Sequence, residues 1–208
     1  MKKVGMLLFT AIMLSAFSIL PSRTSIHIDE REFLVNQFQQ TRDQLLKSLE
    51  GLTDAQLKFK PAQDRWSINE CLEHIILAEK GMYDMEQKLV KEAPNPEKRK
   101  EITATDEDII KRMNDRSHKA KAPEFAIPKG TYATTAEEIQ AFTDQRNRII
   151  EEIKVTQDDL RNHVLITPNM PPVDAYQFLL MMANHSARHT QQIEEIKTDP
   201  AYPKDALQ

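Results

Sequence analysis

The placement of proline is the feature that most constrains how this chain of 208 residues can fold. Proline breaks a helix because it lacks a backbone N–H and its ring clashes with the preceding turn. All eleven prolines fall outside the segments in which apolar residues recur at helical spacing. Long proline-free segments therefore predict helices, and they cover residues 29–49, 67–91, 135–153 and 173–197.

Each of these segments is amphipathic. The apolar stripe is clearest in the first and third segments, where it consists of Leu34, Phe38, Leu45 and Leu49 and of Ile139, Phe142, Ile149 and Ile153. Four amphipathic helices bury their stripes most simply by packing against one another. The predicted fold class is all-α, a four-helix bundle over residues 29–197 followed by a tail over residues 198–208, and no segment has a pattern typical of a strand.

The connections between the helices give further expectations. Residues 53–66 are expected to lack a helix because Pro61 interrupts them. A shorter, polar helix is expected over residues 105–119, in the connection between the second and third long helices and outside the core. The sequence TPNMPP predicts a sharp stop before the last helix, which is expected to begin at Val173.

Two capping boxes predict where the second and third long helices begin. In a capping box, a serine or threonine hydroxyl accepts a hydrogen bond from a free backbone N–H, and a glutamate three residues later reaches back. Ser67 and Glu70 have this spacing, and so do Thr135 and Glu138.

The N-terminus has the layout of a secretory signal. Two lysines precede an apolar run over residues 4–14, and small residues follow. Cleavage is expected after Ser18, which predicts export to the periplasm or the extracellular space. An uncleaved membrane anchor reaching to about residue 24 is the alternative, because the apolar run extended to Leu20 is near the shortest membrane span.

The net charge bears on the possible partners of the protein, and the cysteine content bears on its disulfides. A formal net charge of -4 argues against a nucleic-acid partner, which would need a basic face. Cys71 is the only cysteine, so an internal disulfide is excluded even in an oxidising compartment.

Three histidines are expected to face the interior of the bundle. His185 and His189 are four residues apart, in the stripe that also contains Met182 and Ile193. At this spacing the Cβ atoms are about 5–6 Å apart, so two imidazoles can bind one metal ion. His74 lies on the inward face of the second helix. Three inward imidazoles from two helices predict a metal site with open positions, and buried core histidines bonded to carbonyl groups are the alternative.

The remaining three histidines are expected at the surface. His27 lies near the mature N-terminus, and His118 lies on the polar helix. His163 precedes the proline-rich loop and is the one expected nearest to the rim of the metal site.

The residues around the inward histidines resemble a known family. RWSINECLEHII is followed about 110 residues later by NHSARHTQQIEEI, and this pattern is similar to the DinB/YfiT-like superfamily of metal-dependent enzymes. The resemblance covers about residues 30–197. It rests on Trp-Ser before the second helix, one histidine within that helix, and a histidine pair followed by Gln-Ile. One departure is the loop TPNMPP, where relatives often have a glycine.

The resemblance implies a fold and a ligand set. Members form four-helix bundles that hold a divalent metal ion, often nickel, zinc or iron, with three histidines. Carried over to this sequence, the ligands are His74, His185 and His189.

Gln192 and Glu70 are candidate supporting residues. Gln192 shares the face of the histidine pair and could orient a water molecule or a ligand ring, or it could be a helix-packing amide. Glu70 could act as a base for a metal-bound water, although its place in the capping box explains it without chemistry.

Three further residues lie close to the expected site. Cys71 could be a fourth ligand or a nucleophile, but a small buried thiol is the favoured interpretation. Trp66 is expected to close the end of the bundle. Arg188 lies about 100° around the helix from the ligands and could bind a substrate carboxylate.

Four functions are compatible with this pattern. The first is a metal-dependent hydrolase that activates water for attack on an unidentified small-molecule substrate. A metal-dependent thiol transferase of the same superfamily is the alternative enzyme, but export would separate it from cytosolic thiols. A non-catalytic metal-binding or stress protein and a metal-free interaction module are the other two. Bundles of this kind often dimerise, so a homodimer is a further possibility.

Overall fold

The computed structural model describes residues 26–118, 121–168 and 170–204. The signal segment predicted over residues 1–18, and its alternative as an anchor to about residue 24, lie outside the described residues. Among the helices that are described, none is both long enough and apolar enough to cross a membrane.

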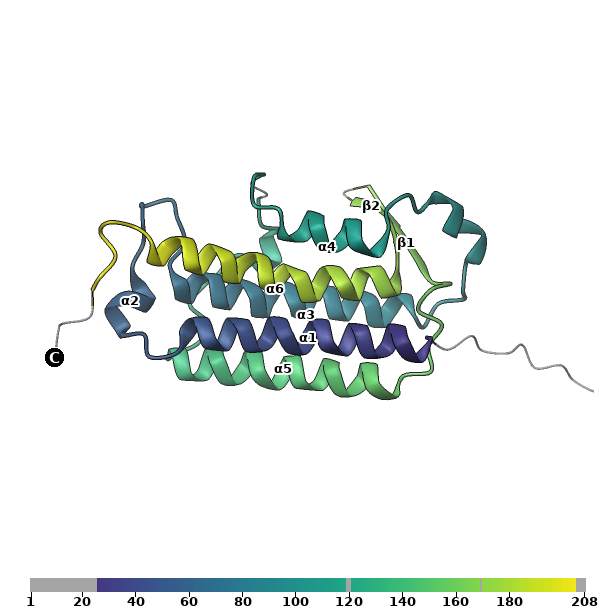
Figure 1. Ribbon diagram of the computed structural model, residues 1–208, viewed down its shortest axis with the longest axis horizontal. Helices are drawn as coiled ribbons and strands as arrows, with labels where there is room; N and C mark the ends of the chain where they lie inside the picture. Colours follow the sequence, from purple (N-terminus) through teal and green to yellow (C-terminus); the bar gives the residue numbers. More distant parts are fainter. Residues whose placement is uncertain (1–25, 119–120, 169, 205–208) are drawn as a thin grey trace, which may run out of the picture.

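Four long helices form the body of the molecule (Figure 1). They are α1 (Ile28–Leu49), α3 (Ile68–Leu89), α5 (Thr135–Val155) and α6 (Ala175–Lys197). Both α1 and α3 pack against α5 on one side and α6 on the other, so the order around the bundle is α1, α6, α3, α5. The predicted all-α bundle is confirmed.

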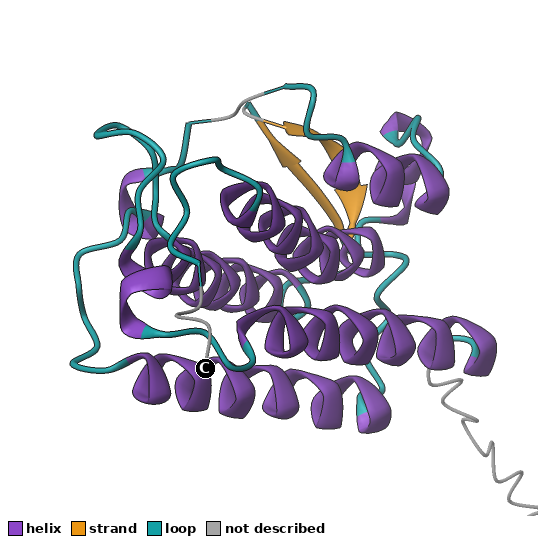
Figure 2. Cartoon of the chain, turned by 60° about the vertical axis from the view of Figure 1, so that its left-hand side comes forward, coloured by secondary structure: helices purple, strands orange, loops and turns teal. Residues whose placement is uncertain are grey.

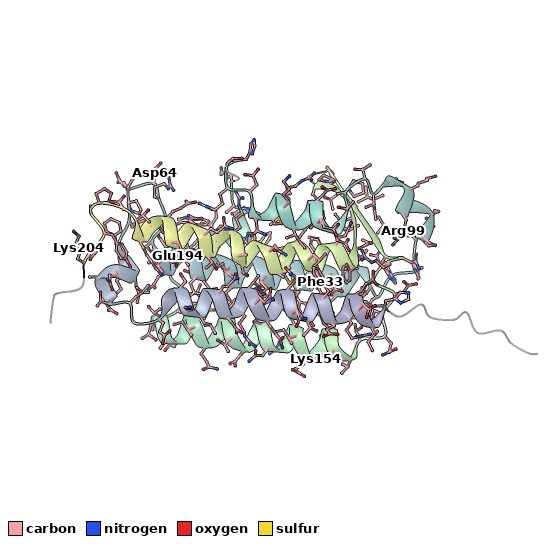
Figure 3. All side chains as sticks on the ribbon, viewed as in Figure 1. Phe33, Asp64, Arg99, Lys154, Glu194 and Lys204 are labelled. Carbon is pink, nitrogen blue, oxygen red and sulfur yellow. The ribbon has the colours of Figure 1, made fainter. Side chains whose placement is uncertain are left out.

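The apolar stripes meet in the interior of this bundle. Leu34, Phe38 and Leu45 of α1 are fully buried, as is Phe142 of α5. Charged side chains such as Lys154 lie on the outer faces (Figure 3). This separation of faces is what the helical periodicity predicted, and burial of the stripes is what holds the four helices together.

The predicted capping box at the start of α3 is confirmed. The Ser67 hydroxyl accepts a hydrogen bond from Glu70 N at 3.2 Å, and the Glu70 carboxylate accepts one from Ser67 N at 2.7 Å. The box predicted at Thr135 and Glu138 is wrong by one residue. Thr134 is the N-cap of α5, and its hydroxyl accepts from Glu137 N, which leaves Glu138 facing the interior.

The short helix between the second and third long helices is part of the core, contrary to the prediction. It is α4 (Asp106–Asn114), which ends before the predicted residue 119 and lies along α6 (Figure 1). Ile109 is only 3% exposed and packs against the bundle. A mostly polar segment is therefore held in place by one inward face.

A β-hairpin precedes α6, although no strand was predicted. It consists of β1 (Val164–Thr167) and β2 (Met170–Asp174), which pair antiparallel (orange in Figure 2). The prolines of β2 exclude a helix but are tolerated in an edge strand. Consequently α6 begins at Ala175 rather than Val173, where Asp174 caps it by accepting a hydrogen bond from Gln177 N at 2.8 Å.

Three short helical elements lie in the connections. They are α2 (Asp54–Lys58), η1 (Pro96–Glu101) and η2 (Glu124–Ala126). The prediction that residues 53–66 lack a helix is wrong, because α2 begins at a Thr53 cap and ends before Pro61. The element η2 packs against α3.

The position of α4 predicts a large effect of Ile109→Ala. Removing a buried side chain costs its transfer free energy plus the free energy of the cavity left behind. We expect the free energy of unfolding, measured by urea denaturation, to fall by about 2–4 kcal/mol. Val155→Ala, at a position that is 69% exposed, should change it by less than about 0.5 kcal/mol. Equal effects of the two substitutions would contradict a core role for α4.

Glu86 of α3 is a buried carboxyl group in the half of the bundle away from His74. Its side chain is 3% exposed and accepts a hydrogen bond from Gln87 Nε2 at 3.0 Å. Burial, together with the nearby Glu152 and Asp158, raises the pKa of Glu86 to about 7. The folded state therefore binds a proton that the unfolded chain releases, so Glu86 destabilises the fold as pH rises through this range.

Glu86→Gln should therefore stabilise the protein in a pH-dependent way. The amide has no charge to bury, so we expect the variant to be more stable than wild type at pH 8 by about 1–3 kcal/mol. At pH 5 the gain should largely disappear, because the wild-type carboxyl is protonated in the folded state. Chemical denaturation at both pH values measures this, with exposed Glu32→Gln as the control. A gain that is the same at both pH values would show that the charge is not the cause.

Candidate metal centre

Three histidine rings meet between α3 and α6. His74 comes from the first half of α3, and His185 and His189 come from α6. The Nε2 atom of His185 lies 3.3 Å from Nε2 of His74 and 3.2 Å from Nε2 of His189. In the described part of the chain, this is the only group of three or more histidine, cysteine, aspartate or glutamate residues whose potential ligand atoms lie close enough together to hold one metal ion. The structure thus brings together the three residues that the sequence predicted as ligands.

Hydrogen bonds on the far side of two rings fix which nitrogen faces the centre. His74 Nδ1 lies 2.7 Å from the carbonyl oxygen of Ala126, and His189 Nδ1 lies 3.0 Å from Gln192 Oε1. Both oxygens can only accept, so the Nδ1 atoms carry the protons. The Nε2 lone pairs of His74 and His189 therefore point toward His185, as in metal sites whose outer hydrogen bonds orient the ligands.

The spacing of the Nε2 atoms fits a divalent cation. Imidazole nitrogens bind zinc at about 2.0–2.1 Å. Two such bonds at an angle of about 90–109° place the nitrogens about 2.8–3.4 Å apart, and the observed separations of 3.3 and 3.2 Å fall in this range. Lone pairs at this distance repel one another unless a proton or a cation lies between them.

The electrostatic environment keeps the three rings neutral. Burial lowers the pKa of each imidazole, and the neighbouring rings also lower the pKa values of His185 and His189. Together these effects bring the pKa of His185 to about 3. Neutral imidazole is the form that binds a metal ion. At neutral pH the centre therefore presents three uncharged nitrogen donors.

The donor set leaves positions for other ligands. No carboxylate or thiolate of the described residues joins the three imidazoles, and three protein ligands with an open position are typical of catalytic rather than structural sites. His74 and His189 are buried, whereas His185 is partly exposed. Of the three ligand residues, His185 is therefore the one nearest to solvent.

Trp66 covers the centre on another side. Its ring lies 4.6 Å from that of His74 and 6.2 Å from that of His189, measured between ring centroids. The sequence placed Trp66 at the end of the bundle without indicating this contact. The indole shields two of the three imidazoles from water.

The loop that supplies the Ala126 carbonyl is held by Glu73, the residue before His74. The Glu73 carboxylate accepts hydrogen bonds from the backbone N–H groups of Lys129, Gly130 and Thr131 at 2.9–3.1 Å, and from the Thr131 hydroxyl at 2.6 Å. Burial raises the pKa of Glu73, but these four bonds lower it more, so the net pKa lies below its usual range. No local pattern predicts this contact, because it joins segments more than 50 residues apart.

Cys71 is a buried thiol, as favoured from the sequence. Its side chain is fully buried, and burial raises the pKa of the thiol to about 12. It does not belong to the histidine group. A protonated, inaccessible thiol is neither a metal ligand nor a nucleophile.

The other candidate residues lie as follows. Gln192 holds the ring of His189. Glu70 is engaged by its capping bond and by Lys60 at 2.8 Å, so the structure provides no contact that would support its role as a base. Arg188 donates hydrogen bonds to the backbone carbonyls of Asp115 and His118. It therefore fixes the loop after α4 and is not free to bind a substrate carboxylate.

The prediction for His163 is wrong. It is buried, with its ring nitrogens 2.7 Å from the Asp159 carbonyl oxygen and 3.1 Å from that of Glu92. Glu92 follows the C-terminal end of α3, so His163 is far along the bundle from His74. His27 and His118 are exposed, as predicted.

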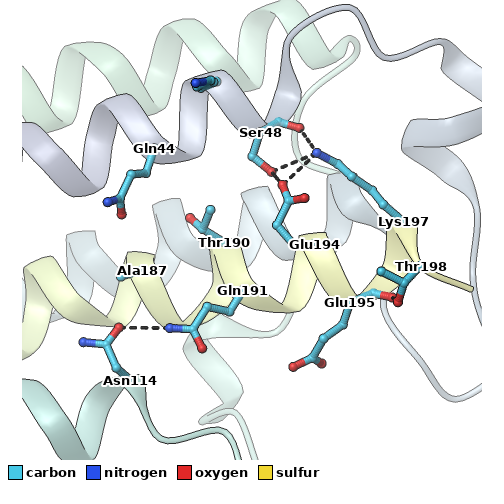
Figure 4. Close-up of a pocket in the computed structure, with 11 residues that line it drawn as sticks. Gln44, Ser48, Asn114, Ala187, Thr190, Gln191, Glu194, Glu195, Lys197 and Thr198 are labelled. Atoms are coloured by element: carbon cyan, nitrogen blue, oxygen red, sulfur yellow. Dashed lines mark hydrogen bonds and ion pairs between the residues drawn. The ribbon is translucent and has the colours of Figure 1, made fainter.

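A wide recess on the described structure does not contain the histidines. It has a volume of about 920 Å³ and lies between α1, α4 and α6 (Figure 4). Its α6 residues, such as Ala187 and Glu194, are on the face of the helix opposite to His185 and His189. Amides and charges of both signs line it, so it gives no indication of one ligand class.

The burial of Cys71 predicts that this thiol is inert in the folded protein. We expect no reaction with a chromogenic disulfide reagent at pH 8, because both access and ionisation are prevented. The thiol should react fully once guanidinium unfolds the chain, which serves as the control. Rapid stoichiometric labelling of the native protein would contradict the assignment.

Comparisons with known proteins agree with this arrangement. The family model described as the DinB superfamily matches residues 37–193. The uncharacterized protein YuaE of Bacillus subtilis (strain 168) is 26% identical over 160 residues, which are 77% of this chain and 94% of YuaE. The solved structure of YfiT from Bacillus subtilis, described as a probable metal-dependent hydrolase with an unusual four-helix bundle topology, has a TM-score of 0.58 and 14% sequence identity. That similarity covers 86% of this chain and 93% of YfiT, and it concerns the fold.

The family model spans most of the bundle, including all three histidines of the centre. The chain therefore belongs to the DinB superfamily.

Proposed function

We propose that His74, His185 and His189 bind one divalent cation and that the protein is a metal-dependent hydrolase. The observation that carries the proposal is the convergence of three Nε2 atoms, two of which have their ring protons held on the opposite side. Membership of the DinB superfamily supports it. So does the description of YfiT as a probable metal-dependent hydrolase, although the similarity to YfiT extends only to the fold.

The chemistry follows from the donor set. A divalent cation at this centre would supply Lewis acidity, which lowers the pKa of water toward neutrality and polarises a carbonyl or phosphoryl oxygen. The chain contributes orientation, because Ala126 and Gln192 hold two of the ligand rings. Trp66 excludes water from one side, and a substrate would approach from the side of the partly exposed His185.

The nitrogen-only donor set also favours certain metals. Imidazole suits zinc, nickel and iron, whereas magnesium and calcium prefer oxygen ligands. Zinc and nickel are therefore suitable probes for binding experiments. Metal analysis of the purified protein identifies the physiological metal.

Hydrolysis is favoured over thiol transfer by the expected location of the protein. The N-terminal signal over residues 1–18 stays a prediction. If the protein is exported, it is separated from the cytosolic thiols that a transferase would use, whereas water is always present.

Metal binding is tested directly by the three histidines. Wild-type protein purified without chelators should bind stoichiometric Zn²⁺ or Ni²⁺, and His74→Ala, His185→Ala and His189→Ala should each weaken binding more than about 100-fold, since loss of an outer-shell partner alone costs 10–100-fold. Ni²⁺ should quench the fluorescence of Trp66, the only tryptophan, because the indole lies against two ligands. His163→Ala removes a buried histidine elsewhere and should leave metal affinity unchanged. A wild-type protein without stoichiometric metal would refute the proposal.

The reaction type requires a separate assay. Metal-loaded wild type should release product from a panel of carboxylic and phosphate esters, and His189→Ala should not. Adding a low-molecular-weight thiol distinguishes the alternative, because a transferase would form a thioether or thioester only when the thiol is present. Tight metal binding with no turnover in either assay would indicate a non-catalytic metal-binding protein.

A further inference from the structure

Arg146 of α5 is the largest fully buried side chain in the described structure. A charged group in this position is unusual, because removing a guanidinium from water is costly unless its donors are all satisfied. The sequence contains a signal for it, since Arg146 lies four residues after Phe142 and three before Ile149, in the middle of an apolar stripe. The proposed reaction does not use this residue, so its burial needs an explanation.

The guanidinium makes hydrogen bonds to each of the other three long helices. It pairs with the Glu79 carboxylate of α3, with Nε 3.2 Å from Oε1 and Nη2 in contact with Oε2. Nη1 donates to the Thr41 hydroxyl of α1 at 3.0 Å and to the Phe38 carbonyl at 3.5 Å, and Nη2 donates to the Ser186 hydroxyl of α6. These contacts account for all five N–H donors of the side chain.

The rings of two phenylalanines enclose this group. The guanidinium carbon lies 4.8 Å from the ring centroid of Phe38 and 5.2 Å from that of Phe142. Glu79 and Ser186 are each 1% exposed. The network is therefore dry as well as fully bonded, and its donor directions are fixed by a planar group.

The network is adjacent to the metal centre on both helices that supply ligands. Ser186 follows His185 directly and precedes His189 by three residues, and Glu79 follows His74 by five. Rotating a helix by about 20° moves an atom about 6 Å from its axis by about 2 Å. Such a rotation of α6 would be enough to separate the Nε2 atoms beyond the reach of one cation.

Stability alone does not explain the ion pair. Replacing a buried ion pair by apolar residues of similar volume is often neutral or stabilising, because desolvation offsets the attraction. Apolar contacts, however, tolerate small rotations of a helix. A guanidinium whose five N–H donors are all bonded keeps those bonds in only one arrangement of the helices. We propose that Arg146, paired with Glu79, is a positioning residue that sets the rotation of α3 and α6 so that His74 meets His185 and His189.

The test separates positioning from stability. The double variant Glu79→Leu/Arg146→Met keeps the buried volume and removes both charges together, so its melting temperature without metal should equal or exceed that of wild type. Its dissociation constant for Zn²⁺, measured by competition with a chromogenic chelator, should increase by about tenfold or more. A folded double variant with wild-type Zn²⁺ affinity would overturn the inference.

Arg161 provides a matched control. It is an arginine in another ionic network, partly exposed and bonded to Glu30, Asp106 and Asp174, none of which belongs to the metal centre. Arg161→Met should lower the melting temperature and leave the Zn²⁺ dissociation constant unchanged. An equal loss of Zn²⁺ affinity in Arg161→Met would mean that general destabilisation is responsible, and the inference would fail.

The Zn²⁺ measurement rests on the proposed function, because it assumes that the protein binds a metal. A measurement without metal tests the positioning role independently. Nuclear Overhauser contacts between the rings of His74 and His185 should be present in wild type and Arg161→Met and be lost or weakened in the double variant. If wild type shows the contact but binds no metal, the proposed function fails, and the ring contacts of the variants still test the positioning role of Arg146. If the double variant does not fold, Ser186→Ala removes only the α6 acceptor and should weaken the same contact. An unchanged contact in a folded variant contradicts the role.

Discussion

The guanidinium of Arg146 lies where α1, α3, α5 and α6 meet, and its hydrogen bonds reach Glu79, Thr41 and Ser186 on the other three helices. Apolar stripes bring the helices together, because burial of apolar surface is favourable, but that attraction has no direction. The N–H donors of the planar guanidinium point in fixed directions, so their hydrogen bonds set how the helices are rotated relative to one another. The convergence of the three histidines depends on this contact, since the ligand-bearing helices must be rotated correctly as well as packed.

The outer side of the centre is built by a different part of the chain. The element η2 and the loop after it pack against α3, where the Glu73 carboxylate binds three consecutive backbone N–H groups. The same loop presents the Ala126 carbonyl to His74. Phe125 lies against Gly81, where an added Cβ would be only 2.5 Å from its ring, so a larger residue at this position would displace the Phe125 ring. One ligand is therefore oriented by a connection rather than by the bundle.

Parts of the structure that rest on local periodicity could be predicted from the sequence. The proline-free segments, the Ser67 capping box and the inward faces of His74, His185 and His189 all follow from spacing along a helix. The β-hairpin could not be predicted, because Val164 and Val173 gain their partners across a turn and the prolines of β2 conceal the strand. The core position of α4 was also missed, since a single buried isoleucine is a weak pattern. His163 was placed at the surface because nothing near it in sequence indicates the carbonyl groups that bond its ring.

The sequence by itself determined four helices, the face that each buries and the three histidines that share the interior, because helical periodicity is a property of neighbouring residues. Only the tertiary structure decided that the Nε2 atoms of His74 and His189 both lie within 3.3 Å of His185 Nε2, and that Trp66 covers two of the rings. It also decided which ring nitrogen carries the proton, through Ala126 and Gln192. These features depend on how helices and loops far apart in the chain rotate and pack against one another, and spacing along a single helix carries no information about that.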